Sequence, residues 1–260
     1  MEVRVNSWNE LQDQLFTDSW QQKLRRFRSP YVFRGLSNAA YNLESSLIRQ
    51  RGNFAELEPH LLRNFRKYAH RDIVERDTLW HWLSLAQHHG LPTRLLDWTV
   101  SPLVAAHFAT AHLDSFTIDG AIWAVNHLKA HQLLPDPLKA ALRQEGADYF
   151  TVEMLAQVVD SLKELDALTP PQFVVFFEPP SIDDRIVNQF ALFSVMPDPR
   201  AVLDDWLQAH PAMWRKIVIP AELKWEIRDK LDQANITERV LFPGLDGLST
   251  WQKRYYTPRS

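Results

Sequence analysis

Hydrophobic positions along the chain repeat with two periods, one typical of amphipathic helices and one typical of buried strands. Helical spacing predicts helices at 8–26, 54–70, 79–89, 102–113, 182–189, 202–209 and 221–234. Apolar or extended runs predict strands at 31–35, 93–98, 121–125, 173–177, 191–195 and 217–219. Ser7 and Glu10 form a capping-box pattern at the first helix, and Ser101 precedes a proline at the start of the helix at 102.

The order of these elements indicates the fold class. Helices and strands are mixed without a regular β-α-β alternation, which favours an α+β fold with a mixed sheet core and flanking helices. We expect an N-terminal helical segment at 1–30, a main domain at 31–248 and a tail at 249–260. Within the main domain, two or three helices at about 127–168 form an insertion.

Composition narrows the class of protein. The 260 residues are 45% hydrophobic and 23% charged, as in ordinary globular domains, and there is no cysteine for thiolate chemistry. The N-terminus lacks the apolar stretch of a signal peptide, which favours the cytoplasm, and no membrane partner is expected. A net charge of −3 does not indicate nucleic acid. Two local basic clusters are interpreted as solvated helix faces: Lys23, Arg25, Arg26 and Arg28, and Arg63, Arg66, Lys67 and Arg71.

The densest group of polar residues lies at 82–108, between two apolar helical stretches. Burying polar side chains without partners costs several kcal/mol, about 2–7 for an amide or hydroxyl, so this segment is either a hydrogen-bond network or a reactive site. His88 and His89 end a helix, where the helix dipole favours a cation. Because adjacent residues point about 100° apart on a helix, the two histidines do not chelate one ion, and we expect no metal site.

Arg34 and Asp97 are the main candidates on strands. Arg34 ends an apolar run, and either it pairs with Glu44 or Asp97 or it binds a phosphate or carboxylate of a ligand. Alternation places Thr93 and Asp97 on one face of an extended segment, where both can face a cleft with His88. The alternative is that Asp97 accepts main-chain bonds or pairs with Arg94 or Arg34.

Later residues add weaker candidates. Arg185 and Gln189 are spaced i, i+4 on a predicted helix and can reach the same group. Glu178 and Glu238 are carboxylates at the edges of apolar runs, and an exposed or capping role is the simpler interpretation of each. The chain has no GxSxG nucleophile elbow and no glycine-rich phosphate loop.

These segments together resemble the FRG domain family, named for a Phe-Arg-Gly motif that occurs here at 33–35. The central signature is AQHHGLPTRLLDWT at 86–99, continued through 109, and later similarities lie at 185–190 and 241–247. The resemblance covers about 31–248. It implies a bacterial or phage-associated protein, in some cases from a host-defence or toxin-like context.

A more distant resemblance is to ADP-ribosyltransferases, in which a strand arginine holds NAD, a polar second strand leads into an alanine-rich helix, and a late glutamate orients the nucleophile. It implies an ADP-ribosyltransferase-like fold, NAD as a nucleotide ligand and a macromolecular acceptor. The implied cofactor-binding residues are Arg34, Gly35, His88, Trp98, which would stack on nicotinamide or adenine, and Arg185. The implied catalytic residues are Arg34, His88, Thr93, Asp97, Gln189 and Glu238.

The chain departs from that second pattern. Thr-Arg-Leu-Leu-Asp-Trp-Thr stands where Ser-Thr-Ser is expected, and the late glutamate is not evident, with Glu238 and Gln189 as its candidates. Two other functions stay open. One is a non-catalytic module that binds a nucleotide or a protein, and the other is a metal-dependent nuclease or hydrolase that uses the histidines.

Overall fold

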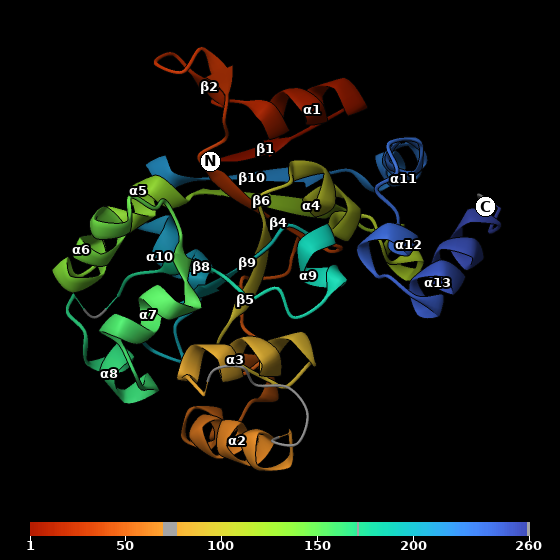
Figure 1. Ribbon diagram of the computed structural model, residues 1–260. Helices are drawn as coiled ribbons and strands as arrows, with labels where there is room; N and C mark the ends of the chain where they lie inside the picture. The colour runs from red at the N-terminus through yellow and green to blue at the C-terminus, as the bar shows by residue number, and fades with distance from the viewer. Residues whose placement is uncertain (70–76, 171, 259–260) are drawn as a thin grey trace.

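Across residues 1–69, 77–170 and 172–258, which the computed structural model describes, eight strands form one mixed sheet (Figure 1). Its strand order is β1-β10-β6-β4-β5-β9-β8-β7. The pairs β1–β10 and β8–β7 are parallel and the other neighbours are antiparallel. The strands are β1 (Glu2–Arg4), β4 (Tyr31–Leu36), β5 (Leu96–Thr99), β6 (Gly120–Asn126), β7 (Phe150–Thr151), β8 (Val175–Glu178), β9 (Ala191–Val195) and β10 (Trp214–Ile219).

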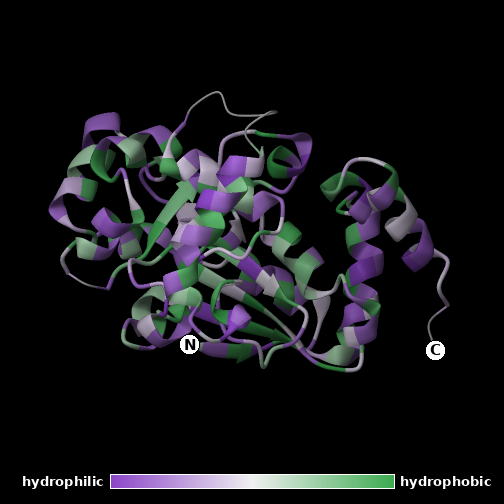
Figure 2. Cartoon of the chain, turned by 90° about the horizontal axis from the view of Figure 1, so that it is seen from below, coloured by the Kyte–Doolittle hydropathy of each residue, from purple (hydrophilic) through white to green (hydrophobic). Residues whose placement is uncertain are grey.

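Helices cover both faces of this sheet, which confirms the predicted α+β class. They are α1 (Trp8–Phe16), α2 (Phe54–Ala69), α3 (Leu79–His88), α4 (Pro102–Ala109), α5 (His127–His131), α6 (Asp136–Glu145), α7 (Val152–Val158), α8 (Leu162–Ala167), α9 (Asp184–Asn188), α10 (Leu203–Gln208), α11 (Lys224–Gln233), α12 (Glu238–Leu241) and α13 (Leu245–Tyr255). Figure 2 shows the apolar strands inside and the polar helix faces outside.

Three apolar clusters hold these layers together. One packs α1, α4 and α11 on one face of β4, β6 and β10. A second, which includes Trp98, Trp123 and Trp206, lies on the other face under α5 and α10. The third joins α2, α3, α6 and α7 to β8 and β9. The described part of the predicted insertion at 127–168 contains four short helices and strand β7, more elements than the two or three helices expected.

The N-terminal segment differs from its prediction. Ser7 caps α1 by accepting from the Glu10 N–H, as expected, but the helix ends at Phe16 rather than near Arg26. Asp18 adopts a φ of 60°, which an α-helix does not allow, and pairs with Arg215. The chain then forms a hairpin from β2 (Trp20–Gln21) and β3 (Arg26–Phe27). Because β1 also joins the main sheet, residues 1–30 are not a purely helical segment.

The C-terminal region also contains more helix than predicted. The motif at 241–247 looks like a turn-rich closure in sequence, yet α13 begins at Leu245 and continues into the expected tail. A Cβ on Gly247 would lie 1.8 Å from the Phe242 carbonyl oxygen, so this glycine allows the start of α13 to pack closely on the end of α12. The last two residues, and His70 and Arg71 of the predictions above, lie outside the described residues.

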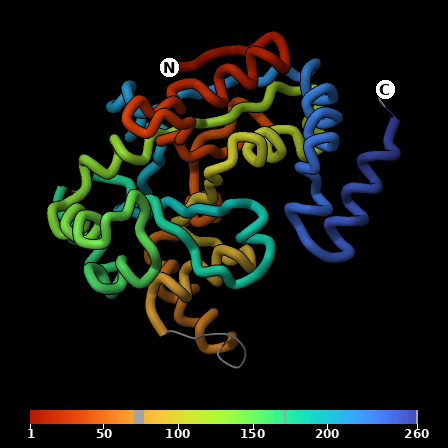
Figure 3. Tube along the Cα trace, turned by 45° about the horizontal axis from the view of Figure 1, so that its top comes forward, coloured from red at the N-terminus to blue at the C-terminus, as the bar shows by residue number. Residues whose placement is uncertain are grey.

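Two features of the sheet shape the space around Arg34. Strand β4 pairs with β6 along its whole length, but with β5 only through Phe33 and Thr99. Helix α4 lies so close to β4 that a Cβ on Gly35 would be 1.9 Å from the Ala105 carbonyl oxygen. The tube view in Figure 3 follows β4 and α4 beside each other and α9 nearby. Among the described residues no helix is both long and apolar enough to span a membrane.

Candidate functional site

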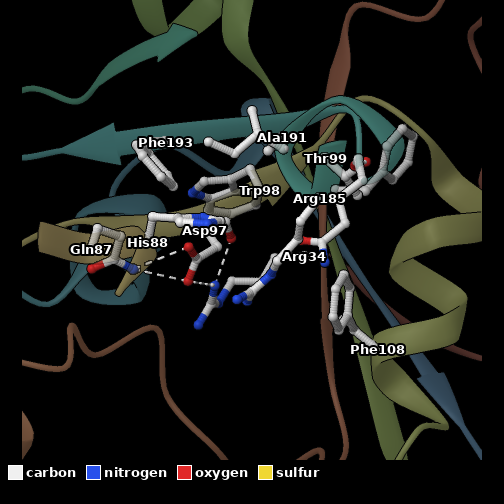
Figure 4. Close-up of a pocket in the computed structure, with 14 residues that line it drawn as sticks. Arg34, Gln87, His88, Asp97, Trp98, Thr99, Phe108, Arg185, Ala191 and Phe193 are labelled. Atoms are coloured by element: carbon white, nitrogen blue, oxygen red, sulfur yellow. Dashed lines mark hydrogen bonds and ion pairs between the residues drawn. The ribbon is translucent and has the colours of Figure 1, made fainter. Parts of the chain in front are cut away.

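A pocket opens where β4 and β5 meet helices α3, α4 and α9 (Figure 4). Its cavity volume is about 210 Å³. Most of the residues selected from the sequence line it: Arg34, Gly35, His88, Asp97, Trp98, Arg185 and Gln189. The fold thus brings together side chains separated by more than 150 positions in the chain.

Arg34 lies mostly buried beside this pocket, with 17% of its side chain exposed. Its Nη1 donates to the main-chain oxygen of Asp97 at 2.5 Å and lies 3.6 Å from Oδ2 of the same residue. Burial lowers the pKa of Arg34, although the Asp97 carboxylate opposes the shift. The buried Nε has no hydrogen-bond partner within the described part of the chain. Since buried donors are nearly always paired, Arg34 has bonding capacity left for a ligand.

Asp97 presents its carboxylate to solvent at the pocket, with 61% of the side chain exposed. Gln87 donates from Nε2 to both carboxylate oxygens at 3.0 Å (Figure 4). Thr93 in turn donates to Oε1 of Gln87 at 2.5 Å. Of the two arginines considered as partners of Asp97, Arg34 forms the ion pair. Arg94 binds Glu58 and Asp166 instead.

His88 is held by a carboxylate from another helix. Its Nε2 lies 2.6 Å from Oδ2 of Asp183, the N-cap residue of α9. Only 9% of the His88 side chain is exposed. A histidine with one ring nitrogen on a carboxylate has a fixed orientation, which is the arrangement of a proton-transfer or hydrogen-bonding group.

The opposite side of the pocket comes from α9 and the turn that follows it. The Arg185 guanidinium lies over the Phe242 ring, 5.0 Å from its centroid. Gln189 donates from Nε2 to the Leu241 oxygen at 2.8 Å, and its main-chain oxygen accepts from the Thr99 hydroxyl at 2.7 Å. These bonds leave Oε1 of Gln189 without a partner among the described residues. Two guanidinium groups against one exposed carboxylate favour an anionic ligand.

Three predicted site residues are placed differently from expectation. Thr93 is 1% exposed and lies behind Gln87, so it does not face the cleft. Glu238 is 4% exposed and forms ion pairs with Arg254 and Arg228, outside the pocket lining. Trp98 contributes to the lining, but its indole packs edge-on against Phe176 in the core and donates to Ser194. With 3% exposure, that ring has no free face on which a ligand can stack.

Other pocket residues were missed in the sequence. Gln87 and Thr99 lie within the central signature but have no chemistry that marks them alone. Phe108 forms an apolar side of the pocket and contacts Phe242. Asp183 has a recognisable signal as an N-cap before an apolar run, but its contact with His88 spans 95 positions and depends on the fold.

No group of three or more His, Cys, Asp or Glu side chains arranged to hold a metal ion occurs among the residues that the structure describes. Glu178, the other carboxylate considered in the sequence, lies at the exposed end of β8, as the simpler interpretation expected.

Comparison with known proteins gives one match. Neither the curated proteins nor the solved structures provide a similar chain. The family model of the FRG domain matches residues 29–117, which include β4, α3, β5 and α4 and therefore the Arg34, His88 and Asp97 side of the pocket. The residues from α9 and β9 that complete the pocket lie outside that match. Residues 29–117 are therefore similar to the FRG domain.

Proposed function

We propose that this pocket binds NAD or a related nucleotide, with an anionic group of the ligand held by Arg34. The observation that carries the proposal is the Arg34 guanidinium, which lies buried beside the pocket with its Nε unpartnered among the described residues. Guanidinium groups bind phosphate oxygens through paired N–H donors. Arg185 supplies a second guanidinium from across the same pocket.

The size of the cavity limits how much of the ligand enters. Pockets that enclose a drug-sized molecule have volumes of roughly 300–1,000 Å³, whereas this cavity measures about 210 Å³. One end of a dinucleotide fits, such as a nicotinamide with its ribose. The remainder would extend out of the pocket, and Phe108, which is partly exposed, supplies an apolar contact for the planar base.

The pocket also supports a hypothesis of chemistry on the ligand. Transfer or hydrolysis of ADP-ribose breaks the bond between nicotinamide and ribose and builds positive charge on the ribose. Asp97 is an exposed carboxylate within the lining, and His88 is a fixed imidazole. Gln189 offers an amide oxygen where the resemblance to ADP-ribosyltransferases requires a glutamate. An amide carries no charge, so we expect Asp97 to supply the main electrostatic stabilisation.

Titration calorimetry with NAD tests binding. We expect binding by the wild-type protein and loss of at least tenfold in affinity for both Arg34→Ala and Arg34→Lys, because lysine keeps the charge but not the paired donors. Arg143→Ala, a change at an exposed arginine on α6, is the matched control. An unchanged affinity in folded Arg34 variants would refute the proposal. If both variants are unfolded by circular dichroism, Arg185→Ala provides the same test at a second residue.

Release of nicotinamide from labelled NAD separates an enzyme from a receptor. An ADP-ribosyltransferase or NAD glycohydrolase releases nicotinamide, and Asp97→Asn then lowers the rate while NAD binding persists. NAD binding without any release would identify a non-catalytic nucleotide-binding module instead. We propose a role in phage defence or as a toxin in the bacterial cytoplasm only for the first outcome, in which nicotinamide is released.

A further inference from the structure

Outside the pocket, the hairpin of β2 and β3 exposes both apolar and basic side chains. Residues 19–29 contain Lys23, Arg25, Arg26 and Arg28 but no acidic residue. The same segment exposes three large apolar side chains: Trp20 is 48%, Leu24 62% and Phe27 66% exposed. Because monomeric proteins rarely expose such groups together, an apolar cluster surrounded by charge marks an interaction surface.

The base of the hairpin is fixed to the body of the protein. Asp18 pairs with Arg215, whose Nη1 lies 2.9 Å from Oδ2 of Asp18. The Arg28 N–H donates to the Ser19 oxygen at 2.6 Å and closes the two strands. The Trp20 and Phe27 rings, directly opposite in the register, pack edge to face with centroids 5.0 Å apart. The cluster therefore has a defined shape, and Figure 1 shows β2 and its loop projecting beyond α1.

We propose that this hairpin binds single-stranded nucleic acid. Proteins that bind single strands combine cationic side chains along the phosphates with aromatic rings on which bases stack. Three of the four cations are arginines, which bind phosphate through paired donors and also stack on bases. Trp20 and Phe27 keep about half or more of their surface free for a base. The net charge of −3 does not prevent this binding, because salt screens charges that lie more than about 10 Å from the phosphates.

The geometry favours a flexible strand over a membrane surface. The aromatic pair lies at the base of the hairpin, and the tip is formed by residues 22–25. A flat bilayer would meet Leu24 at the tip first, while the aromatic rings stay behind it. A single strand can instead follow the side of the hairpin and reach both the rings and the cations. Leu24 supplies the single apolar side chain at the tip, flanked by Lys23 and Arg25.

Fluorescence anisotropy with labelled oligo(dT) and oligo(U) tests the proposal. We expect wild-type binding that weakens with salt, and at least tenfold weaker binding by Lys23→Gln/Arg25→Gln/Arg26→Gln. Loss of three phosphate contacts should also reduce the slope of log affinity against log salt by about 2, at roughly 0.7 per contact. The control variant Arg143→Gln/Lys163→Gln/Lys253→Gln removes three exposed cations elsewhere and should bind like the wild type.

Stacking is tested separately by Phe27→Leu, which keeps an apolar side chain but removes the ring and should weaken binding about tenfold. Circular dichroism melting of each variant reports whether the body of the protein is intact. The proposal is wrong if the wild type does not bind either oligonucleotide at low salt, or if both triple variants lose affinity equally. It is also wrong if only vesicles of phosphatidylserine and phosphatidylcholine bind the hairpin. None of these outcomes depends on Arg34 or on NAD.

Discussion

Nε2 of His88 lies 2.6 Å from Oδ2 of Asp183, and this contact joins α3 to α9 across the pocket. Asp183 also accepts from the Ile186 N–H as the N-cap of α9. Burial alone would raise the pKa of Asp183, but the Ile186 N–H and His88 together hold it below its usual value. Since α9 carries Arg185, the position of the second guanidinium depends on a residue that the sequence motifs do not include.

Asp183 has two functions that substitution can separate. Asp183→Ala removes both the cap and the contact with His88, and we expect it to lower the free energy of unfolding by about 1 kcal/mol and to weaken ligand binding. Asp183→Asn keeps a good capping side chain, so most of the stability should return, while the carboxylate charge that faces His88 is removed. Urea denaturation of both variants measures the free energy of unfolding, and NAD calorimetry measures ligand binding. Equal destabilisation by Asn and Ala would show that capping is the minor contribution.

Gly35 is required by the close approach of α4. In Gly35→Ala the new Cβ would lie 1.9 Å from the Ala105 oxygen and 2.6 Å from the Ala109 nitrogen, both main-chain atoms that cannot move alone. We expect a loss of about 3 kcal/mol in unfolding free energy, at the upper end of overpacking costs. Gly146→Ala is the control, since its Cβ meets nothing within 4 Å and only a left-handed φ of 62° opposes it, at about 1 kcal/mol. A smaller loss at Gly35 than at Gly146 would contradict this role.

Glu238 is expected to matter for stability and not for the pocket. Burial by itself raises its pKa, but hydrogen bonds from Arg254 and the charge of Arg228 lower it to about 2. Glu238→Gln leaves two buried arginines short of a partner and should cost about 3–5 kcal/mol. Glu226→Gln, which removes an exposed pair with Lys230, should cost less than about 0.5 kcal/mol. Thermal melting compares the two. A stable Glu238→Gln variant that lacks NAD turnover would instead support a catalytic role.

Buried histidines should make the protein less stable in mild acid. Burial lowers the pKa of His131 to about 3, and its two ring nitrogens bind the Asp148 oxygen and the Phe176 N–H in the neutral form. The unfolded chain takes up this proton near pH 6.5 while the folded protein does not. Stability is therefore complete above pH 6.5 and falls below it, by about 1.4 kcal/mol per pH unit for each such histidine.

Denaturation at several pH values measures that slope. His131→Gln should be less stable than the wild type at neutral pH but should lose less stability between pH 6.5 and 4, by the contribution of one proton. His127, with a pKa lowered by burial to about 4, should behave similarly. An unchanged slope in His131→Gln would show that His131 is protonated in the folded protein as well.

Much of the sheet could be predicted because its strands are buried on both faces. The run at 121–125 is continuously apolar and the run at 191–195 is apolar except for Ser194, and they form β6 and β9. The β2–β3 hairpin could not be predicted, since strands of two residues are too short for any alternation to be visible. The helix at Leu245 was missed for a different reason. Its first turn contains Gly247, which in sequence indicates a turn and in the structure permits a close contact with Phe242.

The candidate site could be predicted in part. Arg34, His88 and Asp97 have ionisable side chains beside apolar runs, and the fold places them around one pocket. Glu238 was chosen by the same criterion, yet Arg254 and Arg228 pair with it in the core. These residues lie on three different helices, so the pairing depends on tertiary packing. Trp98 shows the limit of alternation as a guide, because residues on either face of an internal strand can be buried.

Strands β4 and β5 are paired at one position only, Phe33 with Thr99. This pair joins two halves of the sheet, each of four strands. Next to that pair, the Arg34 side chain donates a hydrogen bond to the main-chain carbonyl oxygen of Asp97. An anion that binds Nη1 of Arg34 would compete with that carbonyl for the same N–H group. We therefore expect an anion that displaces this carbonyl from Arg34 to loosen the junction between the two halves of the sheet and to change the sheet's twist.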